Sequence, residues 1–402
     1  VGAPGNLEFK QAGAPRREIA PKVLFSNYSK YVDSKEGKLK FAGKASLHAP
    51  GLDFLSVSSF RISKDQLEFV EELGRGNYGT VSKVIHKPTG VLMAMKEVRL
   101  ELEESKFTQI LMELDILHKC VSPYIVDFYG AFFVEGGVFM CMEYMDGGLL
   151  DKIFGGEGVE LETALADITE CVIRGLKELK DEHNIIHRDV KPTHILLNSA
   201  GRVKLCDFGV SGNLVALMAR TNIGCQLYMA PERIWLKQPV DSASSYTVQL
   251  DVWLLGLTIL EISLGHYPYP PETYDNMFLQ LTAIVDGEPP KLDSRFLKAA
   301  QLFVKQCLTK NPDLRPHYAT LLQNPWLLQY RDSDPHMSEI VINRLKVIQE
   351  KTPLRSNLIN ESKAAARQTP ANVPNVRLLL KEKVRAPALH RGGLPMQGRF
   401  RK

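Results

Sequence analysis

The sequence lacks any long apolar run. No stretch reaches the 18 or more apolar residues that a membrane span needs, and the N-terminus lacks the charged-then-apolar pattern of a secretory signal. The cysteines form no CxxC pair and have no short spacing that suits zinc or a disulfide framework; the six are Cys120, Cys141, Cys171, Cys206, Cys225 and Cys307. These absences predict a cytoplasmic protein with reduced thiols and no membrane span. Because the first residue is Val1 and not Met, we expect the natural chain to start further upstream.

Charge of one sign is concentrated at the two ends of the chain. Residues 351–402 carry twelve Lys or Arg against two Glu, and residues 1–63 carry ten basic residues against five acidic ones, so a net charge of +4 hides an acidic body. The basic tail has no interleaved aromatics, and we expect a solvated extension and no nucleic-acid partner. The composition, 44% hydrophobic and 24% charged, excludes a wholly disordered, collagenous or coiled-coil chain. We expect a monomer.

Hydrophobic periodicity divides the chain into a β-rich part and a helix-rich part. Short strand-like runs are predicted at 69–73, 80–86, 91–98, 125–134 and 138–144, and helices at 101–119, 161–183 and 252–264. The two parts meet near Asp146, Gly147 and Gly148, where we predict a hinge. The fold class is therefore α+β with two lobes.

Domain boundaries follow from the same patterns. We predict a mostly disordered N-terminal extension over 1–63, with local order near 54–62, and a basic, largely disordered extension over 331–402. Between them lies one domain, 64–330, with a small β-rich N-lobe (64–145) and a larger α-helical C-lobe (146–330).

A glycine loop and a lysine carry the first chemical signal. Gly74, Gly76 and Gly79 lie between two predicted strands, and glycine lets backbone N–H groups approach phosphates closely. Alone, this pattern is equally typical of a tight turn, and a strand follows it where a dinucleotide-binding fold needs a helix. Lys96 ends an apolar strand, where an ammonium is costly unless it meets an anion. Glu113 on the next helix can pair with it; the alternative is an ordinary surface salt bridge.

Three later motifs decide the interpretation. His187-Arg188-Asp189-Val190-Lys191, Asp207-Phe208-Gly209 and Ala230-Pro231-Glu232 follow the glycine loop and Lys96 in order. Together these motifs resemble the eukaryotic protein kinases over residues 67–327. The resemblance implies the bilobal protein kinase fold, with helix C in the small lobe, and the use of ATP and Mg²⁺.

The resemblance also implies a role for each matching residue. The ATP phosphates would be covered by the loop Gly74, Arg75, Gly76, Asn77, Tyr78 and Gly79. Lys96, held by Glu113, would contact the α and β phosphates, Lys191 would face the γ-phosphate, and Asp189 would accept the proton of the substrate hydroxyl. Asp207 would hold magnesium. The adenine would meet Val81, Ala94, Leu196 and the backbone of Glu143 and Met145, with Met142 guarding the back pocket. Glu232 would pair with Arg315, and Asp251 would brace the catalytic loop.

Four stretches look like the MAP kinase kinases, namely 207–212, 228–233, 141–148 and 190–193. Members of that family phosphorylate Thr and Tyr in the activation loop of a MAP kinase, and a MAP kinase kinase kinase activates them. Residues 44–47, 76–83 and 388–393 are similar to the fungal osmosensing (high-osmolarity glycerol pathway) branch. The implied partners are a downstream MAP kinase, an upstream MAP kinase kinase kinase, and a scaffold or osmosensor adaptor. The segment 302–322 matches the region that receives the upstream kinase, but we expect most of its apolar side chains to be core.

One departure from the family concerns regulation. Thr221 matches the second activating phosphorylation site, whereas the first falls on Leu217, where relatives carry serine. Leucine also replaces serine at Leu55, Leu149, Leu227, Leu250, Leu254 and Leu279. Random drift would scatter the replacements, so we hypothesise a yeast gene that reads CUG as serine, translated with the standard code; the alternative is a decayed paralogue. The codons test this.

The second departure concerns the metal. His194 stands where relatives have asparagine, the expected ligand of a second magnesium, and an imidazole offers no hard oxygen. An alternative to the active enzyme is therefore an impaired pseudokinase that acts as a scaffold in the same cascade. A lipid or small-molecule kinase on the same fold is a third interpretation.

Overall fold

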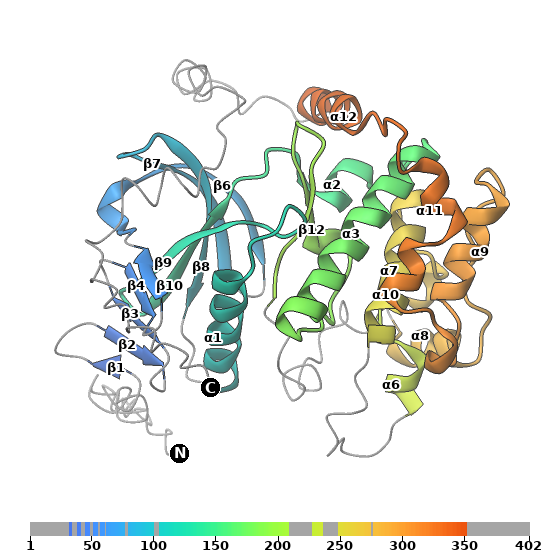
Figure 1. The fold of residues 1–402 in the computed structure, drawn as a ribbon, viewed down its shortest axis with the longest axis horizontal. Helices are drawn as coiled ribbons and strands as arrows, with labels where there is room; N and C mark the ends of the chain where they lie inside the picture. Colours follow the sequence, from blue (N-terminus) through green and yellow to red (C-terminus); the bar gives the residue numbers. More distant parts are fainter. Residues whose placement is uncertain are drawn as a thin grey trace, which may run out of the picture.

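The computed structural model describes residues 32–33, 38–41, 45–48, 51–54, 57–60, 62–76, 79–99, 104–208, 227–235, 248–274 and 276–351. Strands gather at one end of the molecule and helices at the other (Figure 1). This is the predicted α+β arrangement of two lobes. No helix in these ranges has the length and apolar character of a membrane span.

The small lobe is built on an antiparallel sheet of five strands in the order β6 (Leu67–Gly76), β7 (Gly79–His86), β8 (Val91–Arg99), β10 (Gly137–Glu143) and β9 (Phe128–Val134). The sheet has two apolar faces, because successive side chains of a strand point to opposite sides. Val138 and Met140 of β10 pack toward helix α1 (Glu104–Lys119), whereas Phe139 and Cys141 join Val84 on the other face.

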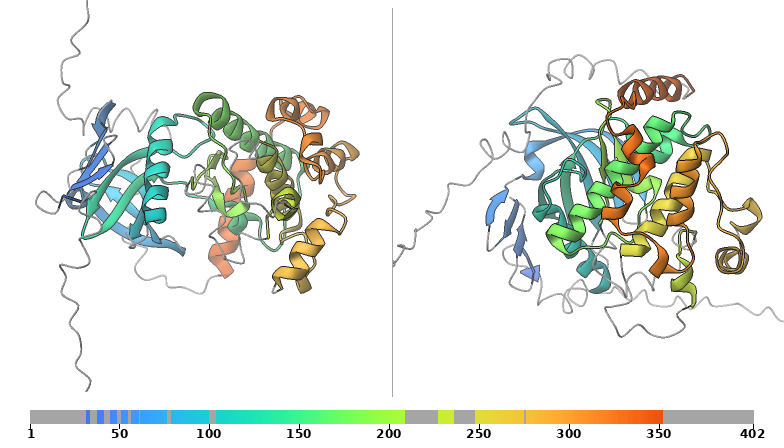
Figure 2. Two further views of the ribbon diagram at one scale, coloured as in Figure 1. Left: turned by 90° about the horizontal axis from the view of Figure 1, so that it is seen from below. Right: turned by 45° about the vertical axis from the view of Figure 1, so that its right-hand side comes forward.

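A second antiparallel sheet precedes this lobe, in the order β1 (Val32–Asp33), β2 (Lys38–Phe41), β3 (Ala45–His48), β4 (Gly51–Phe54) and β5 (Val57–Phe60). Its strands β3, β4 and β5 lie against β9, on the side of the lobe away from the helices (Figure 2). The sequence predicted only local order here, because such short strands carry little periodicity. The short helix η1 (Lys64–Gln66) leads into β6, and Ser63 and Gln66 form a capping box at its start.

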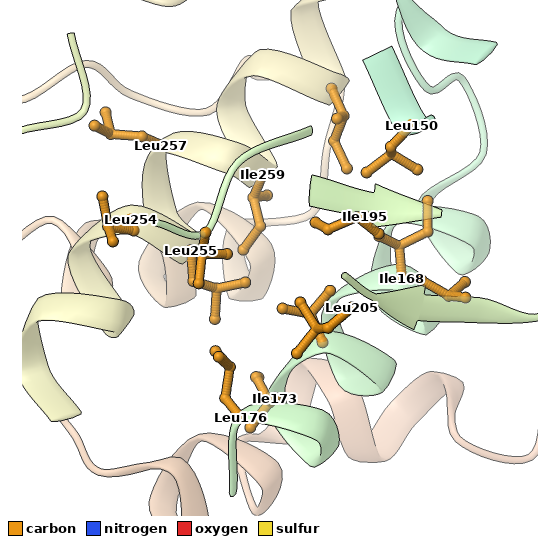
Figure 3. Packing of buried hydrophobic residues seen from close by; sticks show 14 of the residues in the cluster. Leu150, Ile168, Ile173, Leu176, Ile195, Leu205, Leu254, Leu255, Leu257 and Ile259 are labelled. Carbon is orange, nitrogen blue, oxygen red and sulfur yellow. The ribbon is translucent and has the colours of Figure 1, made fainter. Parts of the chain in front are cut away.

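The large lobe packs around α7 (Val248–Leu264), which is buried on all sides. Figure 3 shows its Leu255 and Ile259 facing α3 (Glu162–His183) and the strands β12 (Ile195–Leu197) and β13 (Val203–Leu205). Asn184 ends α3 in a left-handed conformation, and its N–H donates to the carbonyls of Leu179 and Lys180. The strand β11 (Gly148–Leu149) completes a three-stranded sheet with β12 and β13.

Shorter helices surround this core. They are α2 (Leu150–Phe154), α6 (Pro231–Trp235), α8 (Met277–Val285), α9 (Lys298–Cys307), α10 (Tyr318–Leu322), α11 (Pro325–Tyr330) and the turns η2 (Pro192–His194), η4 (Pro271–Thr273) and η5 (Pro312–Leu314). In α9, Phe303, Val304 and Cys307 are buried, as expected for core positions, while Leu302 is half exposed.

The last described helix, α12 (Met337–Lys351), lies in the segment that the sequence analysis assigned to a C-terminal extension. It packs over α2 (Figure 1) and buries Met337 and Val341. Arg344 pairs with Glu157, and the Ser338 hydroxyl donates to the carbonyl of Ser199 at 2.6 Å. The packed part of the chain therefore continues past the predicted boundary at residue 330.

Candidate active site

Lys96 lies where the two lobes meet and contacts a carboxylate from each of them. Its Nζ is 2.7 Å from Glu113 Oε1 on α1 and 3.5 Å from Asp207 Oδ1, just after β13. Burial alone would lower the pKa of the Lys96 ammonium, but the charges of Asp207 and Glu113 outweigh it and raise this pKa above the ordinary value. Lys96 is therefore a fixed cation, and the predicted contact with Glu113 is present.

Helical spacing aims Glu113 at the sheet. Ile110, Leu114 and Leu117 form the buried stripe of α1, and Glu113 lies on the same face, one turn after Ile110. Because apolar packing fixes the helix against the sheet, the carboxylate is held in position by side chains that take no part in the chemistry.

The loop between α3 and β12 carries Asp189, Lys191 and His194. Lys191 Nζ donates to both carboxylate oxygens of Asp189, at 3.1 and 3.0 Å. The carboxylate is buried, so its ammonium partner offsets a charge that would otherwise be costly. His194 lies between Asp189 and Asp207. Its Nδ1 is 3.5 Å from Asp189 Oδ2, and its Nε2 is 3.5 Å from Asp207 Oδ2.

Asp251 of α7 fixes the backbone at the start of this loop. It accepts hydrogen bonds from the N–H groups of His187 and Arg188, at 2.9 and 2.7 Å, and from the Tyr318 hydroxyl at 3.0 Å. Burial raises the pKa of this carboxyl group, although His187 and the three donors oppose the shift. The bracing role predicted for Asp251 thus has the expected geometry.

Two residues of the site have a left-handed backbone that the sequence analysis did not foresee. Arg188 has φ 67° and Asp207 has φ 60°, a conformation that non-glycine residues adopt rarely and at a cost. At Arg188 the Asp251 bonds help hold the conformation. No single-residue pattern indicates such strain, because it is imposed by contacts distant in sequence.

The glycine loop separates into one glycine that the fold requires and two that it does not. A Cβ at Gly79, where φ is 138°, would lie 1.7 Å from the carbonyl oxygen of Glu97 in β8. A Cβ at Gly74 or Gly76 would meet no protein atom within 4 Å. Packing therefore explains Gly79 alone, and the open backbone at Gly74 and Gly76 is free to approach a ligand.

The residues predicted to contact adenine come together on neighbouring strands. Ala94 lies directly opposite Met142 in the β8–β10 register, and Val81 lies opposite Lys96 in the β7–β8 register. The N–H of Glu143 donates to the carbonyl of Asp127 at 2.8 Å. The backbone of Glu143 would therefore bind a base by accepting a hydrogen bond at its carbonyl oxygen.

Beside this register, Met145 is buried, and Leu196 of β12 is half-buried opposite Leu149 of β11. The predicted site residues that remain are three of the glycine loop and the two phosphorylation positions. Arg75 pairs with Glu72 at 3.2 Å on the exposed edge of β6. Asn77, Tyr78, Leu217 and Thr221 lie outside the described residues.

A buried lysine behind this region was missed. Lys204 of β13 is 4% exposed and donates to Glu143 Oε2 at 2.6 Å, which ties the strand to the end of β10. The signal was present in the sequence, because a lysine flanked by Val203 and Leu205 in an apolar strand requires a buried anion.

The metal ligands expected from the family fit unequally. Asp207 offers carboxylate oxygens, the hard ligands that Mg²⁺ prefers. His194 does not fit that role, because it offers nitrogen alone. Its Nδ1 lies 2.8 Å from the carbonyl oxygen of Asp189, and burial lowers the pKa of its ring despite the charges of Asp207 and Asp189.

Comparison with known proteins agrees with this arrangement. The model of the protein kinase domain family matches residues 67–327. A dual specificity mitogen-activated protein kinase kinase of Drosophila melanogaster, dSOR1, is 43% identical over 290 residues, which cover 66% of this chain and 72% of the fly protein. The chain belongs to the MAP kinase kinases. Its two lobes are those of the protein kinase fold, as the sequence predicted.

Two fungal proteins are more similar to this chain. MAP kinase kinase PBS2 of Saccharomyces cerevisiae is 65% identical over 329 residues, which cover 80% of this chain and 49% of the yeast protein. Protein kinase wis1 of Schizosaccharomyces pombe is 59% identical over 335 residues, which cover 83% of this chain and 55% of that protein. The chain spans about half the length of these two curated relatives.

Proposed function

We propose that this MAP kinase kinase transfers the γ-phosphoryl group of ATP to Thr and Tyr in the activation loop of a MAP kinase. The observation that carries the proposal is the position of Lys96, which contacts Glu113 of the small lobe and Asp207 of the large lobe at the same time. Catalysis by protein kinases requires this ion pair of the strand lysine with the helix glutamate, together with an aspartate in position to hold Mg²⁺, the role that Asp207 takes in this proposal.

In this proposal the small lobe, together with Leu196 of the large lobe, holds the nucleotide. The backbone of Gly74 and Gly76 covers the phosphates, and the Lys96 ammonium contacts the α and β phosphates. Val81, Ala94 and Leu196 enclose the adenine, Met142 lies behind it, and Glu143 and Met145 bind it through their backbones. Holding ATP in a fixed orientation supplies a large part of the rate enhancement, since a phosphoryl transfer depends mainly on position and charge.

The catalytic loop acts on the substrate hydroxyl. Asp189 accepts the hydroxyl proton while Lys191, 3.0 Å from the same carboxylate, neutralises charge near the γ-phosphate. Protein kinases use ATP with Mg²⁺, and in this chain the Asp207 carboxylate would hold one ion, which neutralises phosphate charge when bound. Asp251 keeps the loop in shape through its two backbone hydrogen bonds.

Regulation in this proposal follows the family pattern. An upstream MAP kinase kinase kinase phosphorylates Thr221. The other family site falls at position 217, which is serine in relatives and leucine here. Leucine has no hydroxyl to accept a phosphoryl group, so a second phosphate requires that the codon at position 217 is read as serine. Each phosphate adds negative charge that new basic partners bind, and so orders the activation segment.

The similarity to fungal sequences supports a place in an osmotic-stress cascade, in the cytoplasm, with a scaffold or osmosensor adaptor as a further partner. The high identity to enzymes named MAP kinase kinase or protein kinase supports activity over the scaffold-only alternative.

The test is Mg²⁺- and ATP-dependent phosphate transfer to a kinase-dead MAP kinase with a Thr-x-Tyr activation loop. The chain carries Thr221→Glu, Asp189→Asn serves as the blank, and His194→Asn serves as the comparison. We expect transfer that disappears with Asp189→Asn. Equal transfer by the chain and the blank would refute the role of Asp189, and absence of transfer from both the chain and His194→Asn would refute the enzyme.

A further inference from the structure

The ring of His194 lies between two carboxylates at the centre of the site. It is 9% exposed, its Nδ1 is 2.8 Å from the backbone carbonyl oxygen of Asp189, and its Nε2 is 3.5 Å from Asp207 Oδ2. The family resemblance implies magnesium here, held by an asparagine oxygen, whereas this chain offers an imidazole nitrogen at the same position.

The hydrogen bond at Nδ1 decides which ring nitrogen faces Asp207. A carbonyl oxygen only accepts, so the proton of a neutral ring must be on Nδ1, and Nε2 then carries a lone pair. That lone pair faces the carboxylate oxygen of Asp207 across 3.5 Å. Both atoms are electron-rich, so a cation placed between them would be attracted by both, in addition to the Lys96 ammonium that lies 3.5 Å from the other oxygen of Asp207.

The separation of these two atoms suits one shared ion. Ligand atoms that each lie about 2.1 Å from a divalent metal are at most about 4.2 Å apart. In the described part of the chain, no group of three or more His, Cys, Asp or Glu is arranged to hold a metal unaided. Two protein ligands are too few, so the remaining ligands must be phosphate oxygens and water.

A mixed set of nitrogen and oxygen ligands changes the preferred ion. Imidazole nitrogen binds first-row transition metals well and Mg²⁺ poorly, whereas Mn²⁺ also accepts the carboxylate and phosphate oxygens that Mg²⁺ uses. We propose that His194 Nε2 and Asp207 form, with the phosphates of a bound nucleotide, a site that selects Mn²⁺ over Mg²⁺. This proposal rests on the proposed function, because the nucleotide supplies the other ligands.

The experiment uses the full chain, a non-hydrolysable ATP analogue and Mn²⁺, with His194→Asn as the matched control. Electron paramagnetic resonance reports free Mn²⁺ while Mg²⁺ is added. We expect the Mg²⁺ concentration that displaces half of the bound Mn²⁺ to be at least about tenfold higher for the chain than for His194→Asn. Pulsed measurements should detect coupling of an imidazole nitrogen to Mn²⁺ in the chain and none in the variant.

The outcomes separate the two proposals. Nucleotide binding with equal displacement by Mg²⁺ in both proteins, or without nitrogen coupling in the chain, would overturn the Mn²⁺ site and leave the kinase function standing. No nucleotide binding with either metal, measured with a fluorescent analogue, would overturn both. The nitrogen coupling is measured on the unmodified chain, so it decides the question even if the variant fails to fold.

Discussion

The ion pair between Glu232 and Arg315 should be one of the strongest single contacts in the large lobe. Arg315 Nη1 and Nη2 each lie 2.7 Å from a different oxygen of Glu232, and the arginine side chain is 0% exposed. The guanidinium also donates to the carbonyls of Gln249, Thr309 and Lys310 and lies 5.0 Å from the ring centre of Trp253. The pair therefore joins α6, the start of α7 and the segment around η5.

The substitution Glu232→Gln keeps the shape of the side chain and removes its charge. The guanidinium then stays buried with neutral acceptors alone, and breaking a buried pair in this way costs about 3–5 kcal/mol. This is a large share of the roughly 5–15 kcal/mol that stabilises a typical protein. We expect the midpoint of urea unfolding, followed by tryptophan fluorescence, to fall by about 1 M or more.

The matched control is Glu288→Gln, which removes the same charge from a pair with Lys291 that is exposed on both sides. Its unfolding midpoint should equal that of the unmodified chain, because solvent screens exposed pairs. If Glu232→Gln and Glu288→Gln unfold at the same urea concentration, the argument from burial is wrong.

The glycine loop gives a second test. Gly79→Ala puts a Cβ 1.7 Å from the Glu97 carbonyl oxygen and should lower the melting temperature. Gly76→Ala places a Cβ with no protein atom within 4 Å, so it should leave the melting temperature unchanged and weaken only the binding of a fluorescent nucleotide. Equal melting temperatures would contradict this. Burial raises the pKa of Glu261 to about 7, above its ordinary 4.5, so the folded state holds the proton more tightly and the free energy of unfolding should fall as pH rises from 4.5 to 7. Glu261→Gln should remove about 2–3 kcal/mol of that fall in urea unfolding at several pH values, and an unchanged slope would contradict it. Leu149 stands at the N-cap of α2 without a capping hydrogen bond, so Leu149→Ser should raise the free energy of unfolding by about 1 kcal/mol in the same assay, and a decrease would contradict the capping argument.

Sequence patterns predicted the parts of this site that depend on residue type and spacing. A lysine in an apolar strand needs an anion, and an acidic residue on the buried stripe of a helix can supply it, which is why the contact of Lys96 with Glu113 could be predicted. Long helices were placed well because their apolar period repeats many times: α3 begins at Glu162, one residue from its predicted start. The helix predicted from 101 begins instead at Glu104, and the helix predicted from 252 begins four residues earlier, at Val248, since single ends carry little periodic signal.

The features that could not be predicted depend on contacts between distant segments. The left-handed backbone of Asp207 and the packing of α12 over α2 leave no local trace in the sequence. Gly147 shows the difference: it marked a hinge in the sequence, but in the structure a Cβ there would meet the carbonyl of Leu197 at 2.7 Å and the side chain of Val341 at 3.0 Å. Close packing from two directions explains this glycine as well as flexibility does.

The contacts that fix the loop between α3 and β12 do not depend on the side chain of His194. Asp251 fixes the backbone of His187 and Arg188 through bonds that do not involve His194, and Lys191 neutralises Asp189 independently of it. The ring itself adds a bond, from Nδ1 to the carbonyl of Asp189. A histidine at this position therefore leaves the geometry of the Asp189 carboxylate in place while it changes the ligand offered to a metal. We expect its effect to be on the choice of ion before it is on the fold.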